Sequence, residues 1–130
     1  MSKPEPSMDQ WLAEAKASPD AELCGMFLVH DGVVRATAKS QVREGKDMPA
    51  VARVDFSYDA AGLEAAIAEA RTWDGVHYVR VWLNEGELEV GQSLMYVLIG
   101  ADIRPRCIDA LQRLVAHIKN DLVVEREVYA

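Results

Sequence analysis

The sequence is poor in cysteine: Cys24 and Cys107 are the only two among 130 residues. They lie far apart and outside any Cys-x-x-Cys pattern, which argues against a disulfide scaffold. Two isolated thiols are typical of a protein from a reducing compartment. A single domain of this length, 1–130, can bury enough apolar surface to fold without covalent cross-links, so we expect a hydrophobic core to stabilise it.

Long apolar runs and a basic excess are also missing. No run approaches the roughly 18 apolar residues of a membrane-spanning helix, and the opening residues MSKPEPSMDQ contain no apolar segment of signal-peptide length. These absences predict a cytoplasmic protein without membrane contacts. The net charge of −7 argues against a general nucleic-acid binder, which needs a basic face. One local basic pocket stays compatible with that charge.

Motifs for metals and phosphates are absent as well. The three histidines, His30, His77 and His117, stand outside the usual ligand patterns. Gly86 and Gly91 lack the G-x-G-x-x-G spacing, and no helix follows them directly, so turns flanking a strand are favoured over a phosphate-binding loop. We therefore expect neither a metal nor a cofactor.

Two helices are predicted in the first half of the chain. Ser7 and Gln10 have the spacing of a capping box, and the helix that they open ends at Ser18. Asp59 caps a second helix, which ends before Asp74. The apolar faces expected in these helices are Met8, Trp11, Leu12 and Ala15, and then Leu63, Ala66, Ile67 and Ala70.

The strongest strand signal is the apolar run from Leu94 to Ala101. Its length and its bounding turns are typical of a strand that is buried on both faces. A glycine-framed segment, Gly86 to Gly91, leads into it. The longest helix follows, from about Asp102 to Ile118, with Pro105 in the first turn, where its missing N–H costs little. The expected core face of this helix is Ile108, Leu111, Leu114, Val115 and Ile118.

Further strands are predicted at 23–29, 51–58, 76–83 and 122–129 from apolar or alternating patterns. After the first of these, Asp31-Gly32 leaves two alternatives open, a hairpin turn or a glycine bulge within one strand. Residues 1–6 are expected to be a flexible arm with nothing to pack, and 36–50 a mobile loop. The element order αββαβββαβ predicts an α+β fold with a mixed or antiparallel sheet.

The longest helix carries cations at both ends. Arg104 and Arg106 lie at its N-terminus, where a cation is unfavourable unless it binds an anion. Lys119 lies at the other end, where a lysine is ordinary capping. Because 15 residues separate Arg104 from Lys119, they are about 22 Å apart and can share one site only across a symmetric dimer. A buried structural role is favoured for Cys107, although two arginines precede it.

The chain resembles the large, catalytic subunit of molybdopterin synthase along nearly its whole length. The segment with the most specific spacing is G-E-L-E-V-G at 86–91, followed at the family's distances by Arg104 and Lys119. The other matching pieces are EPSMDQWLAEA near the start, Gly25, Gly32-Val33-Val34-Arg35 and Ala110.

This resemblance implies a hammerhead-type α/β fold and a homodimer, each copy binding a small ubiquitin-like sulfur carrier to form a heterotetramer. The carrier's C-terminal Gly-Gly thiocarboxylate would enter a basic pocket, where two sulfurs are transferred to a cyclic pyranopterin monophosphate in molybdenum cofactor biosynthesis. Lys119 and Arg126 would be catalytic, and Arg35, Arg104 and Arg106 would bind the substrate. Arg104 would enter from the partner subunit.

The chain also departs from the family pattern. Asn84 and Ile103 stand where the family has an arginine and a histidine, and its second lysine falls on Glu125 or Arg126. An arginine keeps the charge but cannot shuttle a proton near neutral pH. A second hypothesis therefore stays open, in which a non-catalytic paralogue keeps the fold and the dimer and acts as an adaptor for a sulfur carrier.

Overall fold

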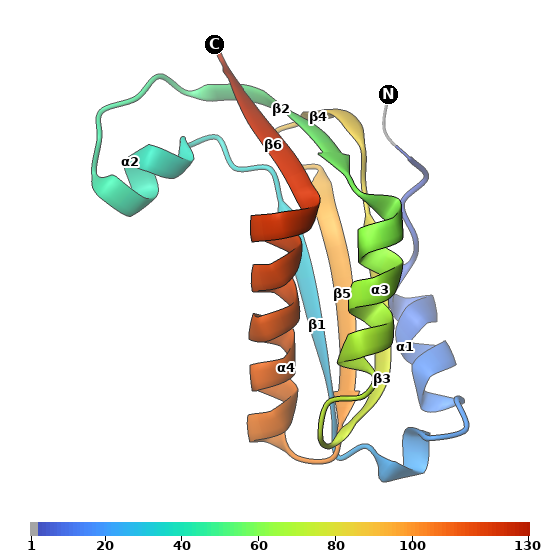
Figure 1. The fold of residues 1–130 in the computed structure, drawn as a ribbon. Coiled ribbons are helices and arrows are strands. Elements are labelled where there is room, and N and C mark those ends of the chain that lie inside the picture. Colours follow the sequence, from blue (N-terminus) through green and yellow to red (C-terminus); the bar gives the residue numbers. More distant parts are fainter. Residues whose placement is uncertain (1–2) are drawn as a thin grey trace.

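The fold is built around β5 (Ser93–Ala101), in which every residue is buried. In the computed structural model, which describes residues 3–130, β5 is the middle strand of an antiparallel sheet. Its neighbours are β1 (Met26–Val33) and β3 (Val76–Leu83). Helices cover both faces of this sheet (Figure 1), which explains why β5 is apolar at nearly every position rather than at alternate ones.

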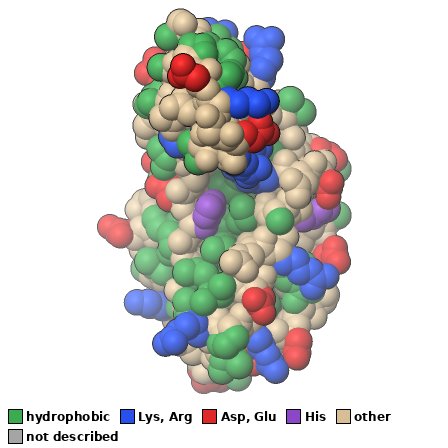
Figure 2. Space-filling view, turned by 90° about the vertical axis from the view of Figure 1, so that its left-hand side faces the viewer, with side chains coloured by type: hydrophobic (Ala, Val, Ile, Leu, Met, Phe, Trp, Pro, Cys, Tyr) green, Lys and Arg blue, Asp and Glu red, His purple; other side chains and the backbone are tan. Residues whose placement is uncertain are grey.

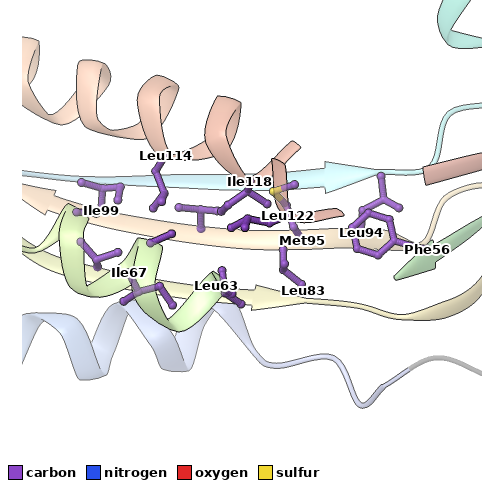
Figure 3. Packing of buried hydrophobic residues seen from close by; sticks show 14 of the residues in the cluster. Phe56, Leu63, Ile67, Leu83, Leu94, Met95, Ile99, Leu114, Ile118 and Leu122 are labelled. Carbon is purple, nitrogen blue, oxygen red and sulfur yellow. The ribbon is translucent and has the colours of Figure 1, made fainter. Parts of the chain in front are cut away.

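One face of β5 contributes to the main core. Met95 and Ile99 point toward α4 (Arg104–His117) and α3 (Ala60–Ala70), which lie side by side on this face (Figures 1 and 3). Figure 3 shows the helix residues that meet them: Leu63, Ile67, Leu114, Ile118 and Leu122. The predicted stripe on α3 is confirmed, since all four of its residues are buried.

The opposite face of β5 packs against α1 (Met8–Lys16). Tyr96 and Leu98 form a smaller core with Trp11, whose ring meets the Tyr96 ring edge-on at 6.1 Å. Ser7 caps α1 by accepting a hydrogen bond from the Gln10 amide at 3.3 Å, as predicted. A short 3-10 turn, Ala21–Leu23, then leads to β1.

A second antiparallel sheet lies beyond the first (Figure 1). Its strand order is β4-β2-β6, with β4 at Gly86–Glu89, β2 at Val51–Tyr58 and β6 at Val123–Tyr129. Asp59 ends β2 and caps α3, accepting a hydrogen bond from the Gly62 amide at 3.0 Å. The α+β class is confirmed, and all of the strand pairs are antiparallel.

The two alternatives for Asp31-Gly32 are now separated. β1 runs through both residues and pairs with β5, with a register shift between Gly32 and Val33. The hairpin is wrong, because neither Asp31 nor Gly32 takes the positive φ that such a turn requires. The register shift matches the bulge alternative. Glycine suits this position because a Cβ there would lie 3.3 Å from Met95 Cγ.

The segment 36–50 contains a six-residue helix, α2 (Lys39–Glu44), where the sequence predicts only a loop. Gly45 ends it in the left-handed conformation, with φ of 69°. The Lys39 amide donates a hydrogen bond to Glu127 Oε2 at 2.9 Å, which ties the start of the helix to β6. Six residues are too few for a periodic apolar pattern. The mobility of this segment stays a prediction.

The N-terminal arm is packed from Lys3 onward, so the expectation that it has nothing to pack is wrong there. Lys3 Nζ donates to Tyr58 Oη at 2.6 Å, and the Lys3 amide donates to Asn84 Oδ1 at 3.0 Å. Tyr96 Oη donates to Glu5 Oε2 at 2.7 Å. Residues 1–2 of the arm lie outside the described residues. These partners come from distant strands, which no local pattern reveals.

The predicted core face of α4 is confirmed except at Ile108: Leu114 and Ile118 are buried, and Leu111 and Val115 pack against the core. Ile108 is 37% exposed, whereas Cys107 and Ala110 are buried together with Leu114. The helix begins at Arg104, and beyond His117 the chain continues in a π-helical turn, Ile118–Leu122. Burial raises the pKa of the Cys107 thiol, as a structural thiol requires.

Candidate active site

A cleft of about 700 Å³ lies where α2, the end of β1 and β6 meet. Its walls hold five cationic side chains against two carboxylates, those of Glu125 and Glu127. Figure 2 shows lysine and arginine side chains gathered where the lobe that contains α2 joins the body. The cations are Arg35, Lys39, Arg43, Lys119 and Arg126. Such a concentration in a chain of net charge −7 indicates a site for an anion.

Lys119 is placed in the cleft by the π-helical turn between α4 and β6. Single π turns within helices are rare and are frequent at functional sites. The Leu122 carbonyl accepts a hydrogen bond from the Asp59 amide at 2.8 Å, which fixes the end of the turn. The Lys119 ammonium lies 3.6 Å from Glu125 Oε1.

Arg35, just after β1, and Arg126, on β6, line the same cleft. Arg35 follows the bulge of β1, and its Nε donates to the Thr37 carbonyl at 3.1 Å. Arg126 Nη2 donates to Asp55 Oδ2 at 3.1 Å, yet the side chain is 72% exposed. The pKa of Asp55 is lowered mainly by its hydrogen bond with Arg53 and further by Arg126. The cleft thus brings together Arg35, Lys119 and Arg126 of the five predicted site residues.

Lys39 and Arg43 complete the cationic wall and were missed in the sequence analysis. They lie four residues apart on α2, so both face the same side of one short helix. Neither side chain forms an ion pair within residues 3–130. Their i, i+4 spacing could have identified them. The segment was interpreted as a loop, however, and this spacing places two side chains on one face only in a helix.

A second, more apolar cavity of about 500 Å³ adjoins the cleft, between α4 and β1. Lys119 and Arg43 line both cavities, so they stand at the junction. His30 borders the second cavity, and its pKa is lowered first by burial and then by the charge of Lys119, against the smaller opposite effect of Asp31. The apolar lining comes from Leu111, Val115 and Ala116.

Arg104 and Arg106 lie outside both cavities. Arg106 is held by two carboxylates, at 2.6 Å from Asp102 and 3.4 Å from Asp74. Arg104 is exposed and has no ion pair within residues 3–130. The 14 residues of α4 span about 21 Å, so Arg104 and Lys119 lie at opposite ends of the helix.

Two of the positions that depart from the resemblance have contrasting surroundings. Asn84 is 2% exposed and holds strand ends together: its Nδ2 donates to the Ser93 carbonyl at 2.9 Å, and its Oδ1 accepts from the Glu85 amide at 2.9 Å. Ile103 is 51% exposed at the start of α4. Asn84 thus has a structural role within the chain, whereas Ile103 is open to solvent or to another molecule.

Residues 3–130 contain neither a candidate metal-binding cluster nor a helix that could span a membrane. No group of three or more histidine, cysteine or acidic side chains is placed to hold a metal ion in that part of the chain. None of its helices has the length and apolar content required to cross a membrane.

Solved structures with the same fold carry related names. A MoaE protein for molybdopterin biosynthesis from Burkholderia ambifaria is 19% identical, with a TM-score of 0.72 over 98% of this chain and 86% of that one. Molybdopterin synthase from Staphylococcus aureus is 16% identical, with a TM-score of 0.68 over 84% and 77% of the two chains. A chain from a complex of subunits 1 and 2 of the Helicobacter pylori molybdopterin-converting factor is 17% identical, with a TM-score of 0.65 over 96% and 84%.

The sequence profile of one protein family, described as MoaE protein, matches residues 3–121. No curated protein matches. The profile covers β1, α2, α4 and Lys119 but ends before β6, which carries Glu125 and Arg126. The chain belongs to the MoaE protein family, that of the molybdopterin synthase large subunit, and this membership supports a role in molybdenum cofactor biosynthesis.

Proposed function

We propose that the chain is the catalytic large subunit of a molybdopterin synthase, which transfers sulfur from a thiocarboxylated carrier protein to a cyclic pyranopterin monophosphate. The observation that carries this proposal is the cationic cleft, which gathers Arg35, Lys119 and Arg126 in an acidic chain of the MoaE family. Arg43 and Lys39 add two further cations that the sequence analysis did not include.

The chemistry of the reactants explains the need for these cations. The pterin substrate carries a phosphate and the carrier ends in an anionic thiocarboxylate, so both are attracted to charge-assisted hydrogen-bond donors. Arg35 and Arg126 would bind these anions through their guanidinium groups. Lys119 would contact the reacting atoms, because it lies at the junction of the two cavities.

A small subunit is the expected partner. The Helicobacter pylori structure of this fold is a complex of two subunits of molybdopterin-converting factor, which supports a carrier for this chain as well. The apolar cavity between α4 and β1 opens beside Lys119. We expect the carrier's C-terminal tail to approach through it, with its thiocarboxylate ending at the cationic cleft.

A second copy of the chain would complete the site. Arg104 is exposed, unpaired within residues 3–130, and a full helix length from Lys119. It would therefore enter the cleft of a partner subunit in a homodimer, and two carriers would make a heterotetramer. Arg106 would join it only by giving up its ion pairs with Asp102 and Asp74.

The cytoplasm is the compartment that we propose for this reaction. Both cysteines are free, and Cys107 is buried, which suits a reducing environment.

A reconstituted reaction tests the proposed function. The purified chain is mixed with a small Gly-Gly-ended carrier bearing a C-terminal thiocarboxylate and with cyclic pyranopterin monophosphate, and dithiolene product is measured by mass spectrometry. We expect product to form while the carrier returns to its carboxylate form. No product, in a mixture where a reference synthase is active, would overturn the proposal.

The same experiment addresses the alternative of a non-catalytic adaptor, which family membership does not favour. An adaptor would bind the thiocarboxylated carrier without consuming it. Growth of a strain that lacks its own large subunit, restored by this chain, would give independent support for catalysis.

A further inference from the structure

We propose that Glu125 is a positioning residue for Lys119, holding its ammonium group inside the cleft as a fixed cation. This inference rests on the proposed function for its catalytic meaning. Glu125 lies just beyond the part of the chain that matches the family profile.

The pair is the most buried ion pair within residues 3–130. Lys119 is 37% exposed and Glu125 is 21% exposed, whereas every other cation in an ion pair there is at least 39% exposed and every other carboxylate at least 30%. Partial burial weakens solvent screening, so the attraction is larger than in an exposed pair.

Glu125 Oε1 has no other partner to explain its burial. It is shielded from solvent and accepts no hydrogen bond within residues 3–130. The Lys119 ammonium at 3.6 Å is close enough for strong attraction but just beyond hydrogen-bond distance. A small inward movement of the lysine would satisfy this oxygen, so the carboxylate draws Lys119 inward.

Both residues belong to segments of backbone that strand pairing or core packing holds in place. Glu125 pairs with Phe56 of β2, whose side chain is 3% exposed in the core. Lys119 lies in the π-helical turn, with the buried residues Ile118 and Leu122 at its two ends. Their relative position is therefore set by the packing of α4 on β5 and β1 and by the pairing of β6 with β2, rather than by a loop.

The surrounding charges explain why Lys119 needs such a partner. Arg43 of α2 lines both cavities beside it, Arg35 and Arg126 line the cleft, and His30 borders the second cavity. Without a nearby carboxylate, the three arginines would repel the ammonium group and push it outward. With Glu125 present, the ammonium is held inward, where it can stabilise an anion.

If Glu125 does not position Lys119, removing its charge should change turnover in the opposite direction. A carboxylate in an anion-binding cleft repels the substrate, so its removal would simply strengthen binding and raise turnover. Positioning instead predicts that neutralising Glu125 lowers kcat, while KM for the anionic pterin falls or stays unchanged.

The first test uses the chain alone and does not depend on turnover. Limiting acetic anhydride acylates neutral amines, and mass spectrometry gives the labelling rate of Lys119 relative to Lys16, which lies exposed on α1. In Glu125→Gln we expect the relative rate to rise about fivefold, as the loss of one partly screened ion pair implies. The Lys119 labelling rate in Glu125→Asp, which keeps the charge, is expected to lie between those of the wild type and Glu125→Gln.

Glu64→Gln serves as the matched control, because Glu64 is exposed on α3 and lies outside the cleft. An unchanged Lys119 labelling rate in Glu125→Gln, in protein that melts at the wild-type temperature, would overturn the proposal even if the chain proves to be an active synthase. Conversely, an increased labelling rate in a chain without synthase activity would leave the pairing in place and refute only the catalytic role.

The second test is the kinetic split in the reconstituted reaction. Glu125→Gln is expected to lower kcat by about tenfold, a share of the effect of a positioned charge, without raising KM. Glu125→Asp should recover part of the loss. A kcat that is unchanged or higher in Glu125→Gln would identify the carboxylate as a repulsive group only.

Discussion

The two ends of α4 carry cations in opposite circumstances. At the first turn, Arg106 is neutralised by Asp102 and Asp74, both of which belong to the same chain. At the far end, Lys119 has a single carboxylate and shares a cleft with four other cations. Arg106 is therefore already satisfied at one end of the helix, whereas Lys119 is left available at the other.

This difference shows why a cation at a helix end is, by itself, weak evidence for an anion-binding site. The helix dipole disfavours Arg106 and favours Lys119, which would suggest that the arginine serves a ligand and the lysine merely caps. The surrounding side chains reverse that inference. Availability for an anion depends on how many carboxylates the rest of the fold brings near, and that number is known only from tertiary structure.

The comparison is tested most strongly by removing the charge at each end. Lys119→Ala is expected to lower dithiolene formation by about 100- to 1,000-fold, the usual loss for a group that stabilises charge at the reacting atoms. Arg106→Ala should instead cost stability, by under about 1 kcal/mol for a surface ion pair. Product formation and urea unfolding of both variants measure the two effects.

Lys16→Ala, on the exposed surface of α1, controls for the general loss of a lysine and should leave both measurements unchanged. Equal losses of activity in Lys119→Ala and Arg106→Ala would show that the two ends are not functionally different.

The comparison also requires α4 to be held rigidly, and Leu114 is the residue that tests this. Its side chain is 1% exposed and points into the main core (Figure 3). Leu114→Ala is expected to lower the free energy of unfolding by about 2–5 kcal/mol. Ile108→Ala, at a position that is 37% exposed, should cost well under half of that. Urea denaturation followed by circular dichroism distinguishes them, and equal costs would mean that Ile108 is covered by another molecule.

Sequence patterns predicted the secondary structure and the core of this protein better than its candidate active site. The apolar run of β5 and the stripe of α3 are local signals, and the structure confirms both. The face of α4 was predicted except at one position, because Ile108 is exposed and Cys107 and Ala110 lie in the core instead. A helix with apolar residues on more than one side leaves its rotation to tertiary packing.

The cleft could be predicted only in part for a related reason. Arg35, Lys119 and Arg126 followed from the family resemblance, and they do meet in one cleft. Arg43 was missed because α2 is too short to give a periodic apolar pattern in the sequence. The importance of Glu125 appears only when β6 brings its carboxylate within 3.6 Å of Lys119. Such long-range proximity has no periodic signature in the sequence.

A mixing experiment tests whether Arg104, the unpaired arginine at the start of α4, serves a second copy. Lys119→Ala and Arg104→Ala are each expected to be inactive or weak as homodimers. If Arg104 completes the partner's cleft, a mixed dimer of the two variants contains one intact site, and random mixing restores about one quarter of wild-type activity. Activity no greater than the mean of the two separate variants would place Arg104 outside the site.

The smallest expected effect concerns His30, which lies beside Lys119 at the far end of α4 and not near its first turn. Because the pKa of His30 is lowered in the folded chain, mainly by burial, the unfolded chain binds more protons at mildly acidic pH. The free energy of unfolding should therefore fall as the pH decreases below about 6.5, the ordinary histidine pKa. In His30→Asn this fall should be shallower, as measured by urea denaturation at several pH values. Identical slopes in the wild type and His30→Asn would show that neither burial nor the charge of Lys119 lowers the pKa of His30 in the folded chain.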